Sequence, residues 1–457
     1  MGIQFSSLSR RNVFVHAEEG QGAFEWWRHS IGDGGINPHP LPERVVRGAQ
    51  KLQPLLIRVF IQEFFYVYPE HGVFDWSRLD PYMDALESTG AKVVASICIK
   101  PKVLYPEIDQ SKWIPNNVTE WQNVIHEMVK RYSVDRPIVT HWEIGNETDI
   151  GEWGGCPYLI TEPKDYHEYY EMTIKPILEA FPNAKVGGPA IANCSNELMS
   201  GFIELCGKKG TRLDFISWHL YCDDLKLHAG YIEKMKKYLK NYPYKQLEMM
   251  VTEVNKSFDP VSVEDLAFEA KRAAISAAIF LTQMDAGLDW SFYYHVWDRT
   301  CYPEDFVNFY ADPYIMIKHW NEIPHRFGMF GVNQEVRPQY FVYQMMGRLG
   351  NQRVAASSND SDLIVRGVSG EGKVSTLIIN YNEQSSSDLI VSIDFTGLIP
   401  GRKMLKTYRI DNEHRWSSEN LELLPVEQRE IVSRDTFNCQ VYSPGDSVLF
   451  LILEDIV

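Results

Sequence analysis

The sequence predicts an α/β protein in which a closed (β/α)8 TIM barrel precedes an antiparallel β-sandwich. Its 457 residues exceed one ordinary domain and can hold a barrel of about 250 residues with a smaller partner. Between about residues 50 and 300, short apolar β-rich runs alternate with longer amphipathic stretches, which is typical of parallel βαβ units. After about residue 345, short β-rich runs separated by turn residues favour a sandwich.

The barrel prediction depends on eight β-rich runs. These runs are residues 29–32, 55–62, 92–99, 138–145, 185–188, 215–221, 248–254 and 288–295. Between them, amphipathic runs predict helices over residues 119–132, 165–181, 230–240 and 263–284, with Thr119 and Ser262 as N-caps. A doubly wound open sheet is the alternative. No GxGxxG fingerprint follows any of these strands, which weakens that alternative.

The C-terminal sandwich is predicted from five further runs, residues 362–368, 374–381, 389–395, 403–410 and 448–453. An early run, residues 12–16, fits a strand of the sandwich as well as a strand of the barrel, and the sequence does not choose between them. We therefore divide the chain into an N-terminal segment at residues 1–20, a catalytic barrel at 21–344 and an accessory sandwich at 345–457.

The overall charge argues against a nucleic-acid partner. The chain carries 61 acidic and 45 basic side chains, and its formal net charge of −16 repels phosphate backbones. No run of about 18 apolar residues occurs, so we expect a soluble protein without a membrane partner. Residues 1–9 lack the apolar core of a signal peptide, and a periplasmic or extracellular location requires that an export signal has been removed. The compartment and the oligomeric state stay open.

The seven cysteines indicate neither a disulfide scaffold nor a zinc site. They are scattered along the chain without CxxC or another metal-ligand spacing. We therefore expect mostly inert thiols, no metal and no cofactor.

Two glutamates near the ends of predicted strands are the candidate catalytic residues. Functional side chains of a barrel lie at the carboxyl ends of its strands, and glycosidic bond cleavage needs two facing carboxyl groups. Glu147, preceded by Asn146, follows the fourth strand in HWEIGNET, and Glu253 lies near the end of the seventh in MMVTEVN. For Glu253 alone, a salt-bridged carboxylate at the barrel rim is the structural alternative. Glu143 lies about 13 Å deeper than Glu147 at about 3.3 Å per residue, so we expect it to be a buried structural carboxylate.

The sequence offers side chains that could bind a sugar but does not rank them. Aromatic residues make up 13% of the chain, and their flat rings can stack on sugars or simply fill a core. Lys256 and Arg299 could pair with the carboxylate of a uronide, with solvated loop charges as the simpler interpretation. The candidate stacking platforms are Trp26, Trp27, Trp153, Trp290 and Trp297.

Several segments of the chain together resemble one known family. They are FDWSRLDPYMDAL, VGGPA, DFISWHLY, YYHVWD and YFVYQMMGRLG, and they span most of residues 25–350. With the two glutamates, they resemble glycoside hydrolase family 39, which includes β-xylosidases and α-L-iduronidases, in the clan of barrels with catalytic glutamates after strands four and seven. The resemblance implies a retaining glycosidase with Glu147 as general acid/base and Glu253 as nucleophile.

The resemblance also implies the surroundings of the two glutamates. It places Arg58 beneath the nucleophile, for which an interior ion pair with Glu143 or Glu253 is the structural interpretation. It turns the side chains after the sixth strand into the site, with Tyr221 hydrogen-bonded to Glu253. The predicted substrate-binding residues are Asn146, His219, Tyr221, Arg58, Trp290 and Asp298.

Three positions depart from the family pattern. Gly145 and Thr148 stand where the family commonly has a tryptophan before and a proline after the Asn-Glu pair, and we expect this change to widen the site. Phe60 stands where the family often has a histidine, which removes a partner for a sugar hydroxyl. The expected substrate is therefore a plant- or host-type saccharide whose sugar is open: a xyloside, arabinoside, galactoside or uronide.

The expected mechanism is double displacement, and it predicts a separation of about 5 to 5.5 Å between the two carboxyl groups. The alternative from another class is a barrel that binds carbohydrate without hydrolysing it. The presence of both carboxylates argues against that alternative, because a binding protein needs neither.

Overall fold

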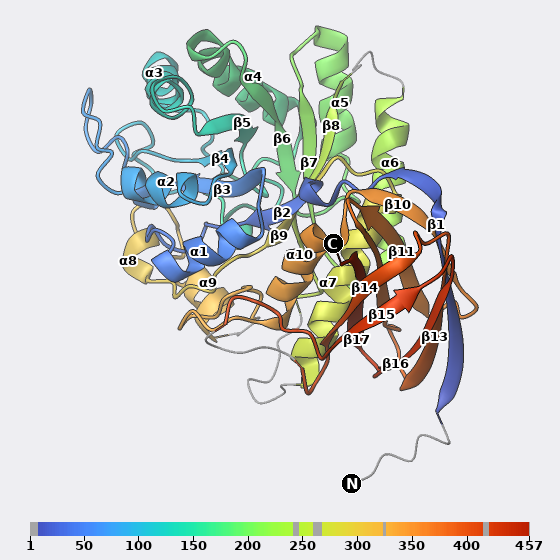
Figure 1. Cartoon of the computed structure of the whole chain (residues 1–457). Coiled ribbons are helices and arrows are strands. Elements are labelled where there is room, and N and C mark those ends of the chain that lie inside the picture. The colour runs from blue at the N-terminus through green and yellow to red at the C-terminus, as the bar shows by residue number, and fades with distance from the viewer. Residues whose placement is uncertain (1–7, 241–245, 259–266, 323–325, 415–419, 457) are drawn as a thin grey trace.

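The computed structural model describes residues 8–240, 246–258, 267–322, 326–414 and 420–456. Its larger part is a closed barrel of eight parallel strands in the order β2 to β9 (Figure 1). All eight coincide with predicted runs, which confirms the barrel. They are β2 (His29–Gly32), β3 (Leu56–Gln62), β4 (Lys92–Cys98), β5 (Val139–Ile144), β6 (Lys185–Ile191), β7 (Phe215–Tyr221), β8 (Glu248–Asn255) and β9 (Trp290–Tyr294).

Helices surround the barrel, and all four predicted ones are present. These are α3 (Val118–Val129), α4 (Pro163–Ala180), α6 (Leu225–Leu239) and α7 (Ala267–Asp285). Thr119 is not the cap of α3, because the Asn117 side chain accepts the backbone N–H of Glu120 and starts the helix earlier. Ser262 and residues 263–266 lie outside the described residues. Six further described helices were not among those named from the sequence. They are α1 (Glu43–Lys51), α2 (Leu79–Glu87), α5 (Leu198–Lys209), α8 (Pro303–Phe306), α9 (Tyr314–Ile317) and α10 (Pro338–Leu349).

The second part is a nine-stranded sheet in the order β15-β14-β17-β12-β11-β10-β1-β13-β16. Side chains from all nine strands enter one hydrophobic core, so the sheet folds over itself into two layers. Every pairing is antiparallel except that of β1 with β13. The strands are β1 (Ser9–Ala23), β10 (Gln352–Ser358), β11 (Leu363–Gly370), β12 (Lys373–Asn380), β13 (Leu389–Thr396), β14 (Gly401–Ile410), β15 (Glu427–Ser433), β16 (Phe437–Ser443) and β17 (Ser447–Asp455).

Strand β1 answers the question that residues 12–16 left open. It pairs with β10 on one side and with β13 on the other, so the start of the chain lies inside the sheet that the end of the chain builds. Figure 1 shows this blue strand among the orange and red ones.

The barrel strands alternate between two environments. On β3, Ile57 and Val59 belong to the large core that packs against the helices, whereas Leu56 and Arg58 point to the barrel axis. At the amino-terminal ends of the strands, five apolar side chains close the barrel. This apolar floor consists of Leu56, Val94, Phe215, Met250 and Phe292. The opposite end is therefore the one that can hold a site.

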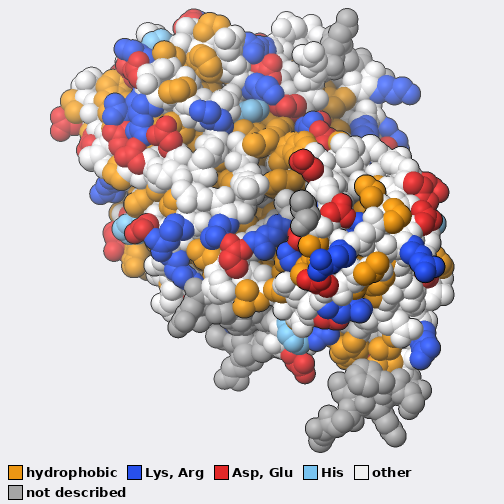
Figure 2. Space-filling model, viewed as in Figure 1, with side chains coloured by type: hydrophobic (Ala, Val, Ile, Leu, Met, Phe, Trp, Pro, Cys, Tyr) orange, Lys and Arg blue, Asp and Glu red, His pale blue; other side chains and the backbone are white. Residues whose placement is uncertain are grey.

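The surface shows no single-sign face in the view of Figure 2, where basic and acidic side chains are interspersed. Within the described ranges, every helix is too short or too polar to cross a membrane.

Candidate active site

A pocket of about 420 Å³ opens at the carboxyl ends of the barrel strands. Glu147 and Glu253 are its only acidic lining residues among those described, and aromatic rings form much of its wall. A pocket with a few polar groups inside an aromatic wall is typical of a small-molecule site. The aromatic lining residues are Phe60, Trp153, Tyr221, Phe258, Tyr294, His319 and Trp320.

Glu253 enters the pocket through an irregularity in β8. Val251 pairs with Trp218 and Glu253 with His219, so the register between β7 and β8 shifts by one residue at Thr252. Val251 and Val254 both pack into the core outside the barrel. Strict alternation from Val251 would turn Glu253 outward as well, and the extra residue turns it inward instead.

Glu147 reaches the pocket through a turn in the left-handed region. Gly145 has φ +82° and Glu147 has φ +45°, and the backbone N–H groups of Ile150 and Gly151 donate to the Glu147 carbonyl. A Cβ on Gly154 would lie 2.3 Å from Glu147 Oε2, so the loop must have glycine there to approach the carboxylate.

Glu143 is buried and paired inside the barrel, as expected, and the chain between it and Glu147 is not fully extended. Arg58 Nη2 donates to both Glu143 Oε2 at 2.7 Å and Asn146 Oδ1 at 2.5 Å, so both acceptors lie around one nitrogen. The estimate of 13 Å between Glu143 and Glu147 assumed an extended chain, whereas β5 ends at Ile144. Asn146 also donates to the Gly154 carbonyl at 2.8 Å and thereby ties the turn to the following loop.

Arg58 binds both Glu143 and Glu253 below the pocket. Its Nε and Nη2 donate to Glu143, and its Nη1 donates to Glu253 Oε1 at 2.6 Å. The Arg58 and Glu143 side chains are wholly buried, and Glu253 is 6% exposed. Arg58 therefore fits both expectations from the sequence. It makes interior ion pairs, and it lies beside Glu253. We call Arg58, Glu143, Asn146 and Glu253 the charged layer.

His219 and Tyr221 contact the two pocket carboxylates from β7. His219 Nδ1 lies 2.7 Å from Glu147 Oε1 and 3.5 Å from Glu253 Oε2, and the Tyr221 hydroxyl donates to Glu253 Oε2. One ligand atom each of Glu147, His219 and Glu253 lies within 4.8 Å of the others. One carboxylate oxygen of Glu147 thus lies within 4.8 Å of one of Glu253, an approach compatible with the separation of about 5 to 5.5 Å in retaining enzymes.

Burial in the pocket raises the pKa of both Glu147 and Glu253. Burial, together with the negative charges of Glu253 and Asp149, raises the pKa of Glu147 well above its usual value. Burial also raises the pKa of Glu253, but the Arg58 charge and the Tyr221 hydrogen bond limit it to about 7. Burial, then the Arg58 charge, lowers the pKa of His219, so its imidazole is neutral.

Of the six predicted substrate-binding residues, only Tyr221 lines the pocket. Arg58, Asn146 and His219 lie beside its two glutamates, whereas Trp290 and Asp298 make other contacts. Trp290 begins β9 at the opposite end of the barrel, where it packs against the apolar floor and its indole N–H donates to Glu248 at 3.3 Å. Asp298 binds Arg337 at 2.5 Å and accepts the Gly328 N–H at 2.7 Å. Burial opposes its ionisation, but the Arg337 charge and His295 lower the pKa of Asp298 far below its usual value. Asp298 therefore holds two chain segments together.

The departures at Gly145 and Thr148 form one structural unit. A Cβ on Gly145 would lie 2.8 Å from Thr148 Cγ2, and Thr148 is fully buried. Neither residue lines the pocket, and the expectation that they widen it stays a prediction. Phe60, the third departure, does line the pocket.

The interpretation of Arg299 as a solvated loop charge is wrong, because Arg299 is buried in an ion pair with Asp33 at 2.5 Å.

Several pocket residues were not predicted from the sequence. Tyr294 ends the eighth barrel strand and Phe258 follows the seventh by three residues, so the strand-end rule could have found both. Met316, His319 and Trp320 come from the long connection after β9, in α9 and the adjoining π-helical turn Lys318–Glu322. No motif in that connection marks them.

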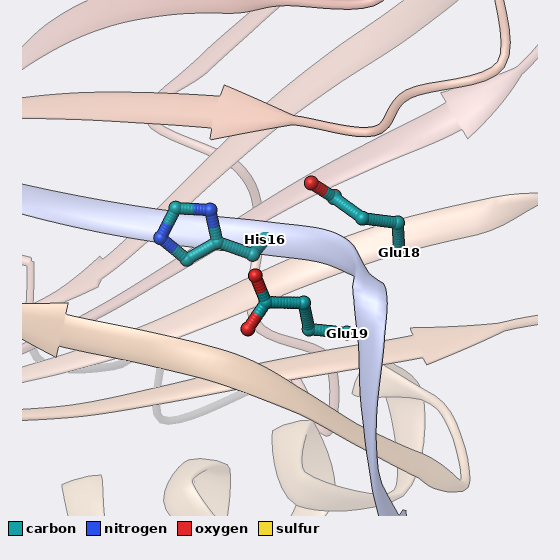
Figure 3. Close-up of side chains that lie close together, drawn as sticks. All are labelled: His16, Glu18 and Glu19. Carbon is teal, nitrogen blue, oxygen red and sulfur yellow. The ribbon is translucent and has the colours of Figure 1, made fainter.

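Two groups of described residues have the composition of a metal site. One is Glu147, His219 and Glu253 in the pocket. The other is His16, Glu18 and Glu19, which gather at a bend of β1 (Figure 3). In the second group, His16 Nδ1 and the Glu18 carboxylate both hydrogen-bond to the Thr396 hydroxyl, at 3.0 and 3.1 Å. These contacts explain the arrangement without an ion.

The fold and the pocket together define a (β/α)8 barrel with a paired-carboxylate site, the architecture of many glycosidases. The profile of glycosyl hydrolases family 39 matches residues 44–415, and the chain belongs to this family.

Three relatives illustrate the likeness. A β-xylosidase of Caldicellulosiruptor saccharolyticus is 23% identical over 341 residues, which are 68% of this chain and 64% of the relative. A β-xylosidase of Geobacillus stearothermophilus is 24% identical over 179 residues, 34% of this chain and 35% of the relative. The chain thus spans just under two thirds of the Caldicellulosiruptor relative and about a third of the Geobacillus relative. The structure of a monomeric β-xylosidase from Caulobacter crescentus has a similar fold, with a TM-score of 0.76, 16% identity, and coverage of 98% of this chain and 100% of that one.

Proposed function

We propose that the protein hydrolyses glycosidic bonds with retention of configuration, with Glu253 as nucleophile and Glu147 as general acid/base. The observation that carries this proposal is the close approach of Glu147, His219 and Glu253, within 4.8 Å, at the bottom of an aromatic pocket. Residues 21–344 form the proposed catalytic domain and residues 345–457 the accessory domain.

In the first step, ionised Glu253 attacks the anomeric carbon while Glu147 gives its proton to the leaving oxygen. The leaving group departs as an alcohol, and the sugar is bound to Glu253 as an ester. Esterification removes the Glu253 charge, which is one cause of the raised pKa of Glu147. Glu147 therefore becomes the base that takes a proton from water as the water oxygen attacks the anomeric carbon and Glu253 leaves. The products are the free sugar, ionised Glu253 and protonated Glu147.

The neighbouring side chains have supporting roles in this proposal. Arg58 and Tyr221 stabilise the negative charge of Glu253 before attack. His219, neutral through burial, orients Glu147 by its 2.7 Å contact. Asn146 accepts from Arg58 and donates to the Gly154 carbonyl, and so holds the turn that carries Glu147. The relatives named β-xylosidase make a β-xyloside the first substrate to test.

The test is azide rescue of the two glutamate variants on 4-nitrophenyl β-D-xyloside and related aryl glycosides. Glu253→Ala should lose turnover and, with azide, form a glycosyl azide of inverted configuration. Glu147→Ala should lose about 10²- to 10⁴-fold in kcat for poor leaving groups and, with azide, form the azide of retained configuration.

Glu248→Gln is the matched control, since Glu248 is an ion-paired carboxylate at the other end of the barrel. It should keep wild-type turnover. Product of inverted configuration from the wild-type protein, or full activity of Glu253→Ala, would overturn the proposed mechanism. Binding of oligosaccharides without any hydrolysis would instead favour a carbohydrate-binding protein.

A further inference from the structure

We propose that Phe60 determines the sugar specificity of this pocket by making it select an uncharged sugar and exclude a uronide. This inference rests on the proposed function and names the substrate class of the same site. It starts from the wall that Phe60 forms beside Glu253.

The wall beside the nucleophile is apolar. The Phe60 ring stacks on Tyr294, with ring centres 6.0 Å apart and planes 9° apart. The Tyr294 hydroxyl donates to the Gly34 carbonyl at 2.8 Å, so its proton is already engaged. The Gly35 backbone presses against the same ring, because a Cβ there would lie 2.3 Å from Phe60. This side of the pocket therefore presents ring carbons to a sugar.

Phe60 also covers the nearest cation. The Arg58 guanidinium carbon lies 4.1 Å from the centre of the Phe60 ring, and the Arg58 side chain is fully buried. All three of its nitrogens donate to Glu143, Glu253 or Asn146. A carboxylate on the sugar cannot approach Arg58 without displacing the ring or one of these acceptors.

The rest of the pocket supplies no replacement for Arg58. No lysine or arginine occurs among the lining residues that the structure describes. Lys256, the other cation considered for a uronide carboxylate, is buried and does not line the pocket. Arg299 is committed to Asp33, and the Lys100 ammonium donates to the carbonyls of Asp109 and Pro157.

A uronide would therefore bring a negative charge next to ionised Glu253 without a compensating cation. At about 5 Å and an effective dielectric constant of about 20, this repulsion corresponds to a penalty of about 100-fold or more. A neutral sugar that directs C–H groups toward Phe60 avoids the penalty and gains contact with the ring.

The experiment compares kcat/KM for 4-nitrophenyl glycosides that share a leaving group. The neutral set is β-D-xyloside, β-D-glucoside and β-D-galactoside, and the acidic set is β-D-glucuronide and β-D-galacturonide. In the wild-type protein, the best neutral substrate should exceed the best uronide by at least about 100-fold.

Two variants assign the selection to Phe60. Phe60→Gln offers an amide N–H to the sugar carboxylate and should lower the neutral-to-uronide ratio by about tenfold, since hydrogen bonds to charged groups are strong. Phe60→Leu keeps an apolar wall and should keep the ratio, although the absolute rates of both sets can change. Thermal unfolding of both variants shows whether each is folded, and the ratio is read only from folded protein.

A uronide hydrolysed as well as the best neutral substrate overturns the inference and leaves the proposed function intact. An unchanged ratio in folded Phe60→Gln removes Phe60 from this role. If no glycoside is hydrolysed, the proposed function fails. Calorimetric Kd values for the same panel then show whether the pocket selects neutral sugars over uronides. Equal binding of neutral and acidic members would overturn it.

Discussion

The two ends of the barrel axis are built from the same strands and differ in what they bury. Leu56 of the apolar floor and Arg58 of the charged layer are two residues apart on β3, and both point to the axis. Met250 and Glu253 form a similar pair on β8, and there an extra residue is needed to turn the second side chain inward. The floor is held by contact alone, whereas the charged layer persists because each carboxylate has a guanidinium or hydroxyl partner.

This difference predicts that removing Arg58 affects stability and turnover together. Arg58→Met leaves Glu143 and Glu253 buried without their cation, so we expect a loss of about 3 to 5 kcal/mol in the free energy of unfolding at pH 8. The loss should be smaller at pH 5, where the unpaired carboxylates take up protons. Denaturant unfolding at both pH values and steady-state kinetics measure the two effects.

The matched control lies on the floor. Leu56→Ala should cost about 2 to 5 kcal/mol through the cavity it leaves, equally at both pH values, while kcat/KM is retained. If Arg58→Met retained kcat/KM, or if its loss of stability were independent of pH, the charged layer would be a structural element like the floor.

A second prediction concerns the pH dependence of turnover. Glu253 must be ionised to attack, and its pKa is raised to about 7, so kcat/KM should fall about tenfold for each pH unit below that value. At alkaline pH, activity should fall again as Glu147 loses its proton. Glu147→Gln, measured with a leaving group that needs no protonation, should keep the acidic limb and lose the alkaline limb. An acidic limb centred below pH 5 in the wild-type protein would contradict the burial of Glu253.

The smallest expected effect concerns the turn that carries Glu147. Gly145→Ala combines a left-handed φ of +82° with a Cβ 2.8 Å from Thr148 Cγ2. It should lower the free energy of unfolding by about 1 to 3 kcal/mol. Gly72→Ala is the control, since Gly72 has a similar φ of +76° and open space around it. Gly72→Ala should lower the free energy of unfolding only by the cost of the left-handed backbone, about 1 kcal/mol. Adding Thr148→Ser to Gly145→Ala should recover the part of the loss due to the clash and leave the conformational part of about 1 kcal/mol, as thermal unfolding can show.

The sequence predicted the barrel because its strands differ sharply from their surroundings. Each barrel strand is a buried β-rich run, and the eight runs were found with small errors at their ends. Three sandwich strands, β10, β15 and β16, were missed. Their sequences QRVAASS, EQREIVS and FNCQVYS mix exposed polar residues with few buried ones, so they lack the apolar signal of a strand.

The candidate site was predicted less completely, since it depends on local departures from regular structure. The rule of strand ends selects Glu147 and Glu253, but it does not reveal the extra residue at Thr252 or the left-handed turn at Gly145. Trp290 was misplaced because a position at the start of a strand was treated like one at its end.

The position of β1 between β10 and β13 has a consequence for how the chain assembles. Without β1, the nine-stranded sheet separates into a group of six strands, β15 to β10, and the pair β13 and β16. Residues 9–23 are synthesised before the barrel, yet both pairing partners of β1 are made only after the whole barrel sequence. The sandwich is therefore closed by contacts of very long sequence separation, which form slowly. The barrel can therefore fold before β1 pairs with β10 and β13.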